Sequence, residues 1–335
     1  MLALQIFLLV LGLVLLVKGA DWFVEGSAGI AKKCKISPLV IGLTVVAFGT
    51  SMPELAVSVT SAIEHSTDIA VGNVVGSNIA NILLILGVSA LLHPLPVQRE
   101  SLRLDLPVLL AASILIYGLG AWGGSLAWYD GIVLLAVFSV YMVLLFRQAG
   151  KKRKQMLAAC PDGASFEEEE DEEPHGRIGG WMHRMERNMW FLVLLAVVGL
   201  GMVVGGGTLL VNAATYIAEF AGVSERIIGL TIVAIGTSLP ELVTSVIAAA
   251  KGQTDIAVGN VIGSNIFNIF MVAGVASLVF PLSFTAGNGI DALVALGAAV
   301  LLFALSLFKG HKLGRIAGGI FLASFAGYYT YLFLA

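Results

Sequence analysis

A segment of 47 residues occurs twice in this chain, and no other feature limits the possible folds as strongly. When the sequence is shifted by 187 positions, residues 41–87 align with residues 228–274 without a gap, and 30 of the 47 pairs are identical. Self-similarity on this scale predicts two structurally equivalent halves. Both copies are mostly apolar, so the character of the flanking segments decides what kind of repeat protein this is.

The flanking segments are long and apolar enough to cross a membrane. A spanning helix needs about 20 mostly apolar residues. Only 12% of the residues are charged, which excludes a soluble enzyme, and no basic excess is present to bind nucleic acid. The sequence therefore predicts an all-α polytopic membrane protein with ten transmembrane helices, at about 2–30, 38–63, 69–92, 104–121, 127–147, 189–218, 226–250, 256–280, 288–308 and 313–334.

The position of the repeat within these spans predicts an inverted arrangement. Each copy covers the second and third of five spans, which divides the chain into a first half at 1–148, a charged linker at 149–188 and a second half at 189–335. Because five is odd, the two halves enter the membrane in opposite orientations. Two inverted five-helix repeats are typical of secondary transporters, in which each side of the membrane reaches a central site in turn.

The basic residues predict which side each loop faces. With the N-terminus outside, 17 of the 19 Lys and Arg residues fall in inside loops or at their borders, as the positive-inside rule requires. We therefore expect both termini outside and the linker in the cytoplasm. The linker contains KKRK at 151–154 and EEEEDEE at 167–173, a composition typical of a solvated, disordered segment, with calcium sensing as the alternative.

The repeated motifs GTSMPE and GTSLPE lie in the middle of their spans and end in Glu54 and Glu241. Proline cannot donate the next helical hydrogen bond, so each span is expected to break and to free carbonyls near Ala47 and Ala234. A carboxylate at the bilayer centre indicates a functional site, and neither glutamate has a basic partner in the repeated segments. Bound cations would relieve their repulsion; the alternative is two protonated glutamates bonded within the bundle.

Neutral oxygen donors accompany the two carboxylates. The third and eighth spans contribute Ser77 and Asn81, and Ser264 and Asn268, and the members of each pair are four positions apart, so that they share a helix face. The predicted set of ligands is all oxygen, which suits calcium or sodium better than zinc or copper. We expect four further asparagines to bond between helices or to support these ligands: Asn73, Asn78, Asn260 and Asn265.

The two GTSxPE motifs, followed in both halves by GNVxGSN at 72–78 and 259–265, resemble the alpha-repeats of the cation/calcium exchanger superfamily, and specifically of prokaryotic sodium/calcium exchangers. The resemblance makes 41–87 the first alpha-repeat and 228–274 the second. It implies an antiporter rather than an enzyme, without a cofactor, that exchanges sodium for calcium across a prokaryotic inner membrane. The implied ion ligands are Glu54 and Glu241, shared by calcium and sodium; Thr50 and Thr237 for calcium; Ser51, Ser77, Ser238, Ser264 and the carbonyls of Ala47 and Ala234 for sodium; and Asn81 and Asn268 in the middle of the cluster.

Two features bear on the type of exchanger. Some relatives, including potassium-dependent members, carry Asp at one of the positions held here by Asn81 and Asn268. Amides at both positions limit the cluster to two negative charges and disfavour potassium cotransport. A proton/calcium antiporter that uses the same glutamates is the first alternative, and a cation channel is the second.

The first and sixth spans are long and rich in glycine, and we expect them to slide against the rest of the protein. If more sodium charge than calcium charge moves, exchange is electrogenic, at about 2.3 kcal/mol per charge for each 100 mV. The expected direction under an inward sodium gradient is calcium extrusion.

Overall fold

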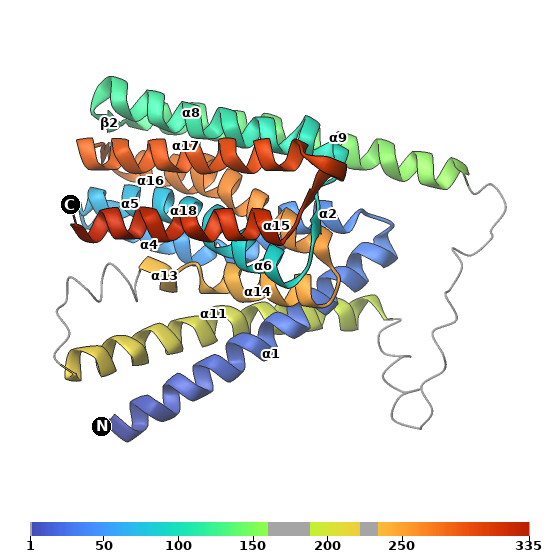
Figure 1. The fold of residues 1–335 in the computed structure, drawn as a ribbon, viewed down its shortest axis with the longest axis horizontal. Coiled ribbons are helices and arrows are strands. Elements are labelled where there is room, and N and C mark those ends of the chain that lie inside the picture. Colours follow the sequence, from blue (N-terminus) through green and yellow to red (C-terminus); the bar gives the residue numbers. More distant parts are fainter. Residues whose placement is uncertain (1, 160–187, 222–233, 335) are drawn as a thin grey trace.

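The computed structural model describes residues 2–159, 188–221 and 234–334. The regular secondary structure of this part of the chain is helical except for four strands of two residues each, so the predicted all-α class is confirmed (Figure 1). The first half contains α1 (Leu2–Cys34), α2 (Pro38–Ile41), η1 (Gly42–Val46), α3 (Ala47–Thr50), α4 (Met52–Ile63), α5 (Thr67–Ile79), η2 (Ala80–Ile85), α6 (Leu86–Leu92), β1 (Leu95–Pro96), α7 (Arg99–Arg103), α8 (Asp105–Gly123), β2 (Ser125–Leu126) and α9 (Trp128–Ala159).

The second half repeats this order of elements. It contains α11 (Met189–Phe220), α13 (Ala234–Gly236), α14 (Leu239–Ala250), α15 (Thr254–Phe267), η4 (Asn268–Val272), α16 (Ala273–Val279), β3 (Leu282–Ser283), α17 (Ala286–Leu307), η5 (Lys309–His311), β4 (Lys312–Leu313) and α18 (Arg315–Leu334). The elements η1, η2 and η4 are π-helical and η5 is a 3₁₀ turn.

Seven helical stretches in the described residues are long and apolar enough to cross a membrane, and the bent pair α2–α4 makes an eighth. The chain is therefore an integral, multi-pass membrane protein. The predicted span 226–250 begins among residues outside the described part, and α14 is its described end. Helix α18 has 20 residues but is not among the seven, so the number ten stays a prediction.

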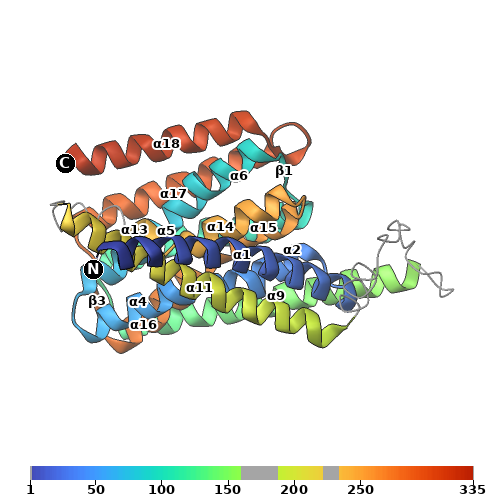
Figure 2. The same ribbon diagram turned by 90° about the horizontal axis from the view of Figure 1, so that it is seen from below.

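The repeat extends beyond the 47 residues that the sequence alignment covers. Helices α4 and α14 begin at Met52 and Leu239, and strands β1 and β3 begin at Leu95 and Leu282, each pair 187 positions apart. β1 pairs antiparallel with β4, and β2 with β3, so each small sheet joins a loop of one half to a loop of the other. The two sheets lie at opposite ends of the bundle (Figures 1 and 2).

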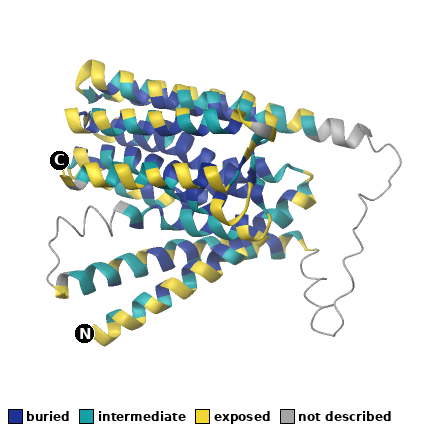
Figure 3. Ribbon diagram, viewed as in Figure 1, coloured by how far each residue is buried: buried dark blue, intermediate teal, exposed yellow. Residues whose placement is uncertain are grey.

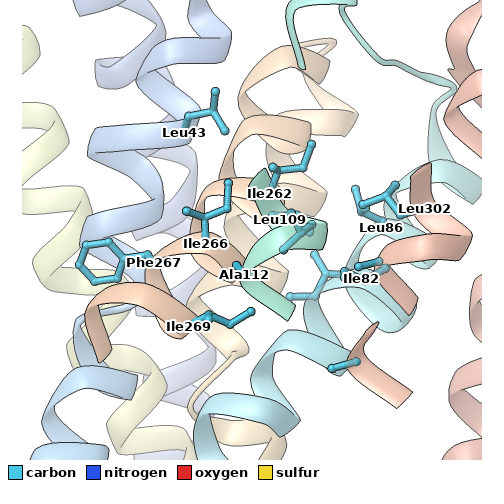
Figure 4. Close-up of a cluster of buried hydrophobic side chains, with 14 of the residues drawn as sticks. Leu43, Ile82, Leu86, Leu109, Ala112, Ile262, Ile266, Phe267, Ile269 and Leu302 are labelled. Atoms are coloured by element: carbon cyan, nitrogen blue, oxygen red, sulfur yellow. The ribbon is translucent and has the colours of Figure 1, made fainter. Parts of the chain in front are cut away.

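The apolar core surrounds α5 and α15, which are apolar on most of their surface and buried for most of their length. Side chains from several elements meet there: Leu43 of η1, Ile82 of η2, Leu109 of α8, and Ile262 and Ile266 of α15 (Figure 4). Because these elements come from both halves, the core fixes the halves against one another at mid-bundle.

Helices α1 and α11 form a separate antiparallel pair along one side of the bundle. Their axes approach closely through glycine: a Cβ added at Gly19 would lie 2.8 Å from the Gly199 carbonyl oxygen. The N-terminal third of α1 is largely exposed, whereas most of the buried residues of this helix lie in its C-terminal half (Figure 3). Near that buried half, Lys251 at the end of α14 forms ion pairs with Asp21 (2.5 Å) and Glu25 (3.4 Å).

The described part of the predicted linker differs from expectation. Helix α9 continues to Ala159, so residues 149–159 of the predicted linker are helical, and the prediction that they are disordered is wrong. Residues 151–159, KKRKQMLAA, are mostly strong helix formers, which allows the helix to continue beyond its apolar part. The rest of the predicted linker lies outside the described residues except Asn188. Both termini lie at one end of the bundle, and α9 ends at the other (Figure 1).

Candidate functional site

Both repeated motifs break their helices as predicted. Ser51 (φ −86°, ψ 7°) separates α3 from α4, and Ser238 (φ −89°, ψ 6°) precedes α14. Pro53 and Pro240 fall in the first turn after the break, where the backbone N–H that proline lacks would have no helical partner. The segments on either side of Ser51 meet at 44°.

The break frees fewer carbonyls than expected. The carbonyl of Ala47 accepts a hydrogen bond from the Ser51 amide (3.0 Å), so the prediction that this oxygen loses its helical partner is wrong. The turn of helix continues to Thr50, and the interruption begins one residue later. Pro53 has no N–H, so it cannot donate to the carbonyl of Gly49, which would be its partner in an unbroken helix. Ala234 begins α13, and Ser238 N donates to Ile235 O (3.1 Å).

The two glutamates lie together between the halves, and both are fully buried. Ser51 Oγ donates to Glu241 Oε1 (2.9 Å), and Ser238 Oγ donates to Glu54 Oε1 (3.3 Å). Each serine precedes the glutamate of its own half by three residues and binds the glutamate of the other half. None of the ion pairs found in the described part of the chain involves either carboxylate.

Several buried oxygens of the two glutamates and of other predicted ligands have no hydrogen-bond partner in the described part of the chain. These atoms are the second carboxylate oxygens, Glu54 Oε2 and Glu241 Oε2, with the amide oxygens of Asn81 and Asn268 and the hydroxyl of Ser264. Leaving a polar atom buried and unpaired costs about 1–3 kcal/mol. Native structures keep few such atoms, and a group of them indicates an ion or water that binds there.

The asparagines lie at irregular points in their helices. Asn81 falls within the π-helical η2 and Asn268 begins the π-helical η4, and such segments are often found at functional sites. Both side chains are fully buried, and their amide nitrogens are also unpaired. Ser77 Oγ, one turn before Asn81, lies 3.2 Å from Ser238 Oγ and so joins the cluster directly.

The two threonines face asparagines of the opposite half. Thr50 Oγ1 lies 3.1 Å from Asn260 Oδ1, and Thr237 Oγ1 lies 3.3 Å from Asn73 Oδ1. The prediction that Asn73 and Asn260 bond between helices is confirmed, whereas Asn265 Nδ2 donates to Val261 O of its own helix (2.6 Å). Sequence reasoning missed the further partners of these amides, Ser58 and Ser245, although both are identical at the 187-residue offset.

The chemistry of the cluster favours a hard cation. Its donors are two carboxylates, hydroxyls and amide oxygens, which are the ligands that calcium and sodium prefer. Within the described ranges, no group of three or more His, Cys, Asp and Glu side chains could hold a metal ion. The negative charge of the cluster therefore comes from Glu54 and Glu241 and reaches two when both are ionised.

Known proteins resemble this chain over nearly its whole length. The profile of the sodium/calcium exchanger protein family matches residues 4–147 and 191–334. The chain is 42% identical to CaxA of Alkalimonas amylolytica over 336 residues, and 34% identical to the sodium/calcium exchanger MaX1 of Methanosarcina acetivorans over 349 residues, with 99% of each chain covered in both cases. A structure of the sodium-calcium exchanger NCX_Mj soaked with Na⁺ and Ca²⁺ matches with a TM-score of 0.80 at 33% identity, covering 97% of both chains.

Proposed function

The chain belongs to the sodium/calcium exchanger protein family, and from that premise we propose that it is a secondary active antiporter that exchanges sodium for calcium by alternating access. The observation that supports this most strongly is the crossed pair of contacts between Ser51 and Glu241 and between Ser238 and Glu54. They bring two buried carboxylates, one from each half, to one place, and no ion pair among the described residues gives either of them a basic partner. Calcium or several sodium ions would supply the missing positive charge.

The proposed architecture has ten spans in two inverted five-helix halves, at 1–148 and 189–335, with alpha-repeats at 41–87 and 228–274. The equal spacing of helices and strands along the two halves supports this division. The antiparallel course of α1 and α11, the first helix of each half, supports the inversion (Figure 1). We place the protein in a prokaryotic inner membrane, with both termini outside and the connection between the halves in the cytoplasm, because the basic residues favour that orientation.

The proposed ion ligands are those named from the sequence. Glu54 and Glu241 are shared by calcium and sodium, and their unpaired second oxygens are available to an ion. The other proposed ligands are Thr50 and Thr237 for calcium; Ser51, Ser77, Ser238, Ser264 and the carbonyls of Ala47 and Ala234 for sodium; and Asn81 and Asn268 in the middle of the cluster. An oxygen that already accepts one hydrogen bond, such as Ala47 O, keeps a second lone pair for an ion.

The charge of the two glutamates couples sodium transport to calcium transport in this proposal. The two glutamates bind either one calcium ion or several sodium ions, and occupancy neutralises the cluster. An empty cluster with two negative charges resists the change between outward- and inward-open forms, whereas a neutral one permits it. Ions drive this change only through different affinities for the two forms. If more sodium charge than calcium charge moves, exchange responds to voltage and extrudes calcium under an inward sodium gradient.

Flux measurements test the proposal. Purified protein in liposomes should take up calcium-45 when sodium is loaded inside, and a pH gradient alone should drive little uptake. Glu54→Gln and Glu241→Gln should abolish sodium-driven uptake, whereas Glu64→Gln, the same change at an exposed position, should not. Uptake that follows the pH gradient would favour a proton/calcium antiporter, and uptake without any counter-ion would favour a channel. Normal exchange by Glu241→Gln would overturn the shared-ligand assignment.

A further inference from the structure

Two asparagines connect the halves beside the proposed ion site. Asn73 Nδ2 donates to Glu54 O (3.0 Å) and to Ser58 Oγ (2.9 Å), and its Oδ1 accepts from Thr237 Oγ1 (3.3 Å). Asn73 and Glu54 belong to the first half, and Thr237 belongs to the second. One amide thus ties the backbone of one broken helix to the side chain of the other.

Asn260 occupies the equivalent place in the second half. Its Nδ2 donates to Ser245 Oγ (2.9 Å), and its Oδ1 accepts from Thr50 Oγ1, which also lies 3.1 Å from Val46 O. Asn260, Ser245 and Thr50 are all fully buried. Two chains of the form Ser–Asn–Thr therefore run in opposite directions across the boundary between the halves.

These chains determine how the threonine hydroxyls are presented. A hydroxyl has one hydrogen and two lone pairs, and an asparagine side chain offers both donors and an acceptor. Because the amide nitrogens of Asn73 and Asn260 are held by serines, their oxygens face Thr237 and Thr50. Each threonine hydrogen is then directed to an oxygen of the protein, which leaves the threonine oxygen with only lone pairs for other partners.

The chains also constrain the distance between the two carboxylates. Thr50 and Glu54 flank one break, and Thr237 and Glu241 flank the other. Because each amide holds the break of the opposite half, the breaks cannot move apart without loss of both contacts, at 3.1 and 3.3 Å. The amides therefore limit the size of the space between the glutamates.

We propose that Asn73 and Asn260 are positioning residues that set cation selectivity by size, holding the two broken helices at the separation that fits calcium. The proposal rests on the proposed function. Loss of either amide would let the breaks relax outward, so larger divalent cations would be accepted more readily. We therefore expect a change in the preference for one divalent cation over another, rather than a change in the overall transport activity.

The test compares Asn260→Ala with Asn265→Ala in proteoliposomes. Asn265 is a fully buried asparagine of the same helix, and its Nδ2 donates to Val261 O of that helix (2.6 Å). The readout is the KM of calcium-45 uptake and its inhibition by Sr²⁺ and Ba²⁺. The loss of one hydrogen bond corresponds to a change of about threefold to tenfold in an equilibrium constant. We expect Asn260→Ala to lower the preference for Ca²⁺ over Ba²⁺ by that factor, and Asn265→Ala to leave it unchanged.

A purely structural role would lower the amount of active protein and Vmax for all three cations equally. If Asn260→Ala does not fold, Ser245→Ala takes its place in the test. This change removes only the partner that orients the Asn260 amide, and it should shift the Ca²⁺/Ba²⁺ preference in the same direction. An unchanged Ca²⁺/Ba²⁺ preference in whichever of these variants folds would overturn the proposal. If the wild-type protein transports no calcium, the proposed function itself fails, which is a separate result.

Discussion

The contact between α1 and α11 should be unusually sensitive to a single added methyl group. In Gly199→Ala, the new Cβ would lie 2.6 Å from Phe23 N and 2.7 Å from Gly19 O. Both are backbone atoms, so no side chain can turn aside. Reaching an ordinary separation of about 3.5 Å requires the helices to move apart by roughly 0.9 Å, which forfeits a quarter to a half of their local dispersion energy. We expect destabilisation of about 1–3 kcal/mol.

Gly201→Ala is the matched control for this prediction. Gly201 lies two residues further along α11, is exposed, and has open space where a Cβ would be. There the substitution should be neutral or slightly stabilising, because alanine favours the helix over glycine by about 1 kcal/mol. Thermal unfolding of the two purified variants in the same detergent gives the comparison. Equal melting temperatures for Gly199→Ala and Gly201→Ala would refute the close-packing argument.

Two further substitutions test contacts outside the ion cluster. Lys251→Gln removes the partly exposed ion pair with Asp21, which is worth about 0.2–1 kcal/mol. We expect up to a fivefold change in the ratio of the calcium KM values measured from the two faces of oriented vesicles. An unchanged ratio would show that the ion pair favours neither the outward- nor the inward-open form. Tyr141→Phe removes the hydroxyl that donates to the buried Asp105 carboxylate (3.0 Å) and should destabilise the protein by about 1–3 kcal/mol, seen as a lower melting temperature. The exposed Tyr129→Phe is its control, and equal melting of the two variants would contradict the expected role of this bond.

The parts of the site that the sequence predicts correctly are those set by local chemistry. Proline in an apolar span predicts a break, and the breaks at Ser51 and Ser238 and the burial of the glutamates beside them are confirmed, whereas the role of Glu54 and Glu241 as ion ligands stays a prediction. The extent of the break does not follow, because one more helical bond, from Ser51 to Ala47, depends on the fine geometry of the turn. The continuation of α9 to Ala159 does not follow from the apolar pattern either, because charged residues can continue a helix that apolar residues begin.

Contacts between the halves are harder to predict from the chain. The repeat shows that Ser51 and Ser238 are equivalent, but not that each binds the glutamate of the other half rather than its own. Strands of two residues carry no periodic pattern, so the pairing of β1 with β4 has no signature in the sequence. Ser58 and Ser245 are the exception, because their identity at the repeat offset was available as a signal.

The two small sheets have a mechanical consequence. One connects the halves at each end of the bundle, through the loops that flank α8 and α17. Because the two halves are joined at both ends of the bundle, the helices between these sheets cannot easily tilt independently of one another. Any large rearrangement that exposes the interior to opposite faces would then fall to α1 and α11, which meet chiefly each other and carry no strand of either sheet. A disulfide introduced across β2 and β3 should accordingly be harmless to turnover, while one between α1 and α14 should arrest it.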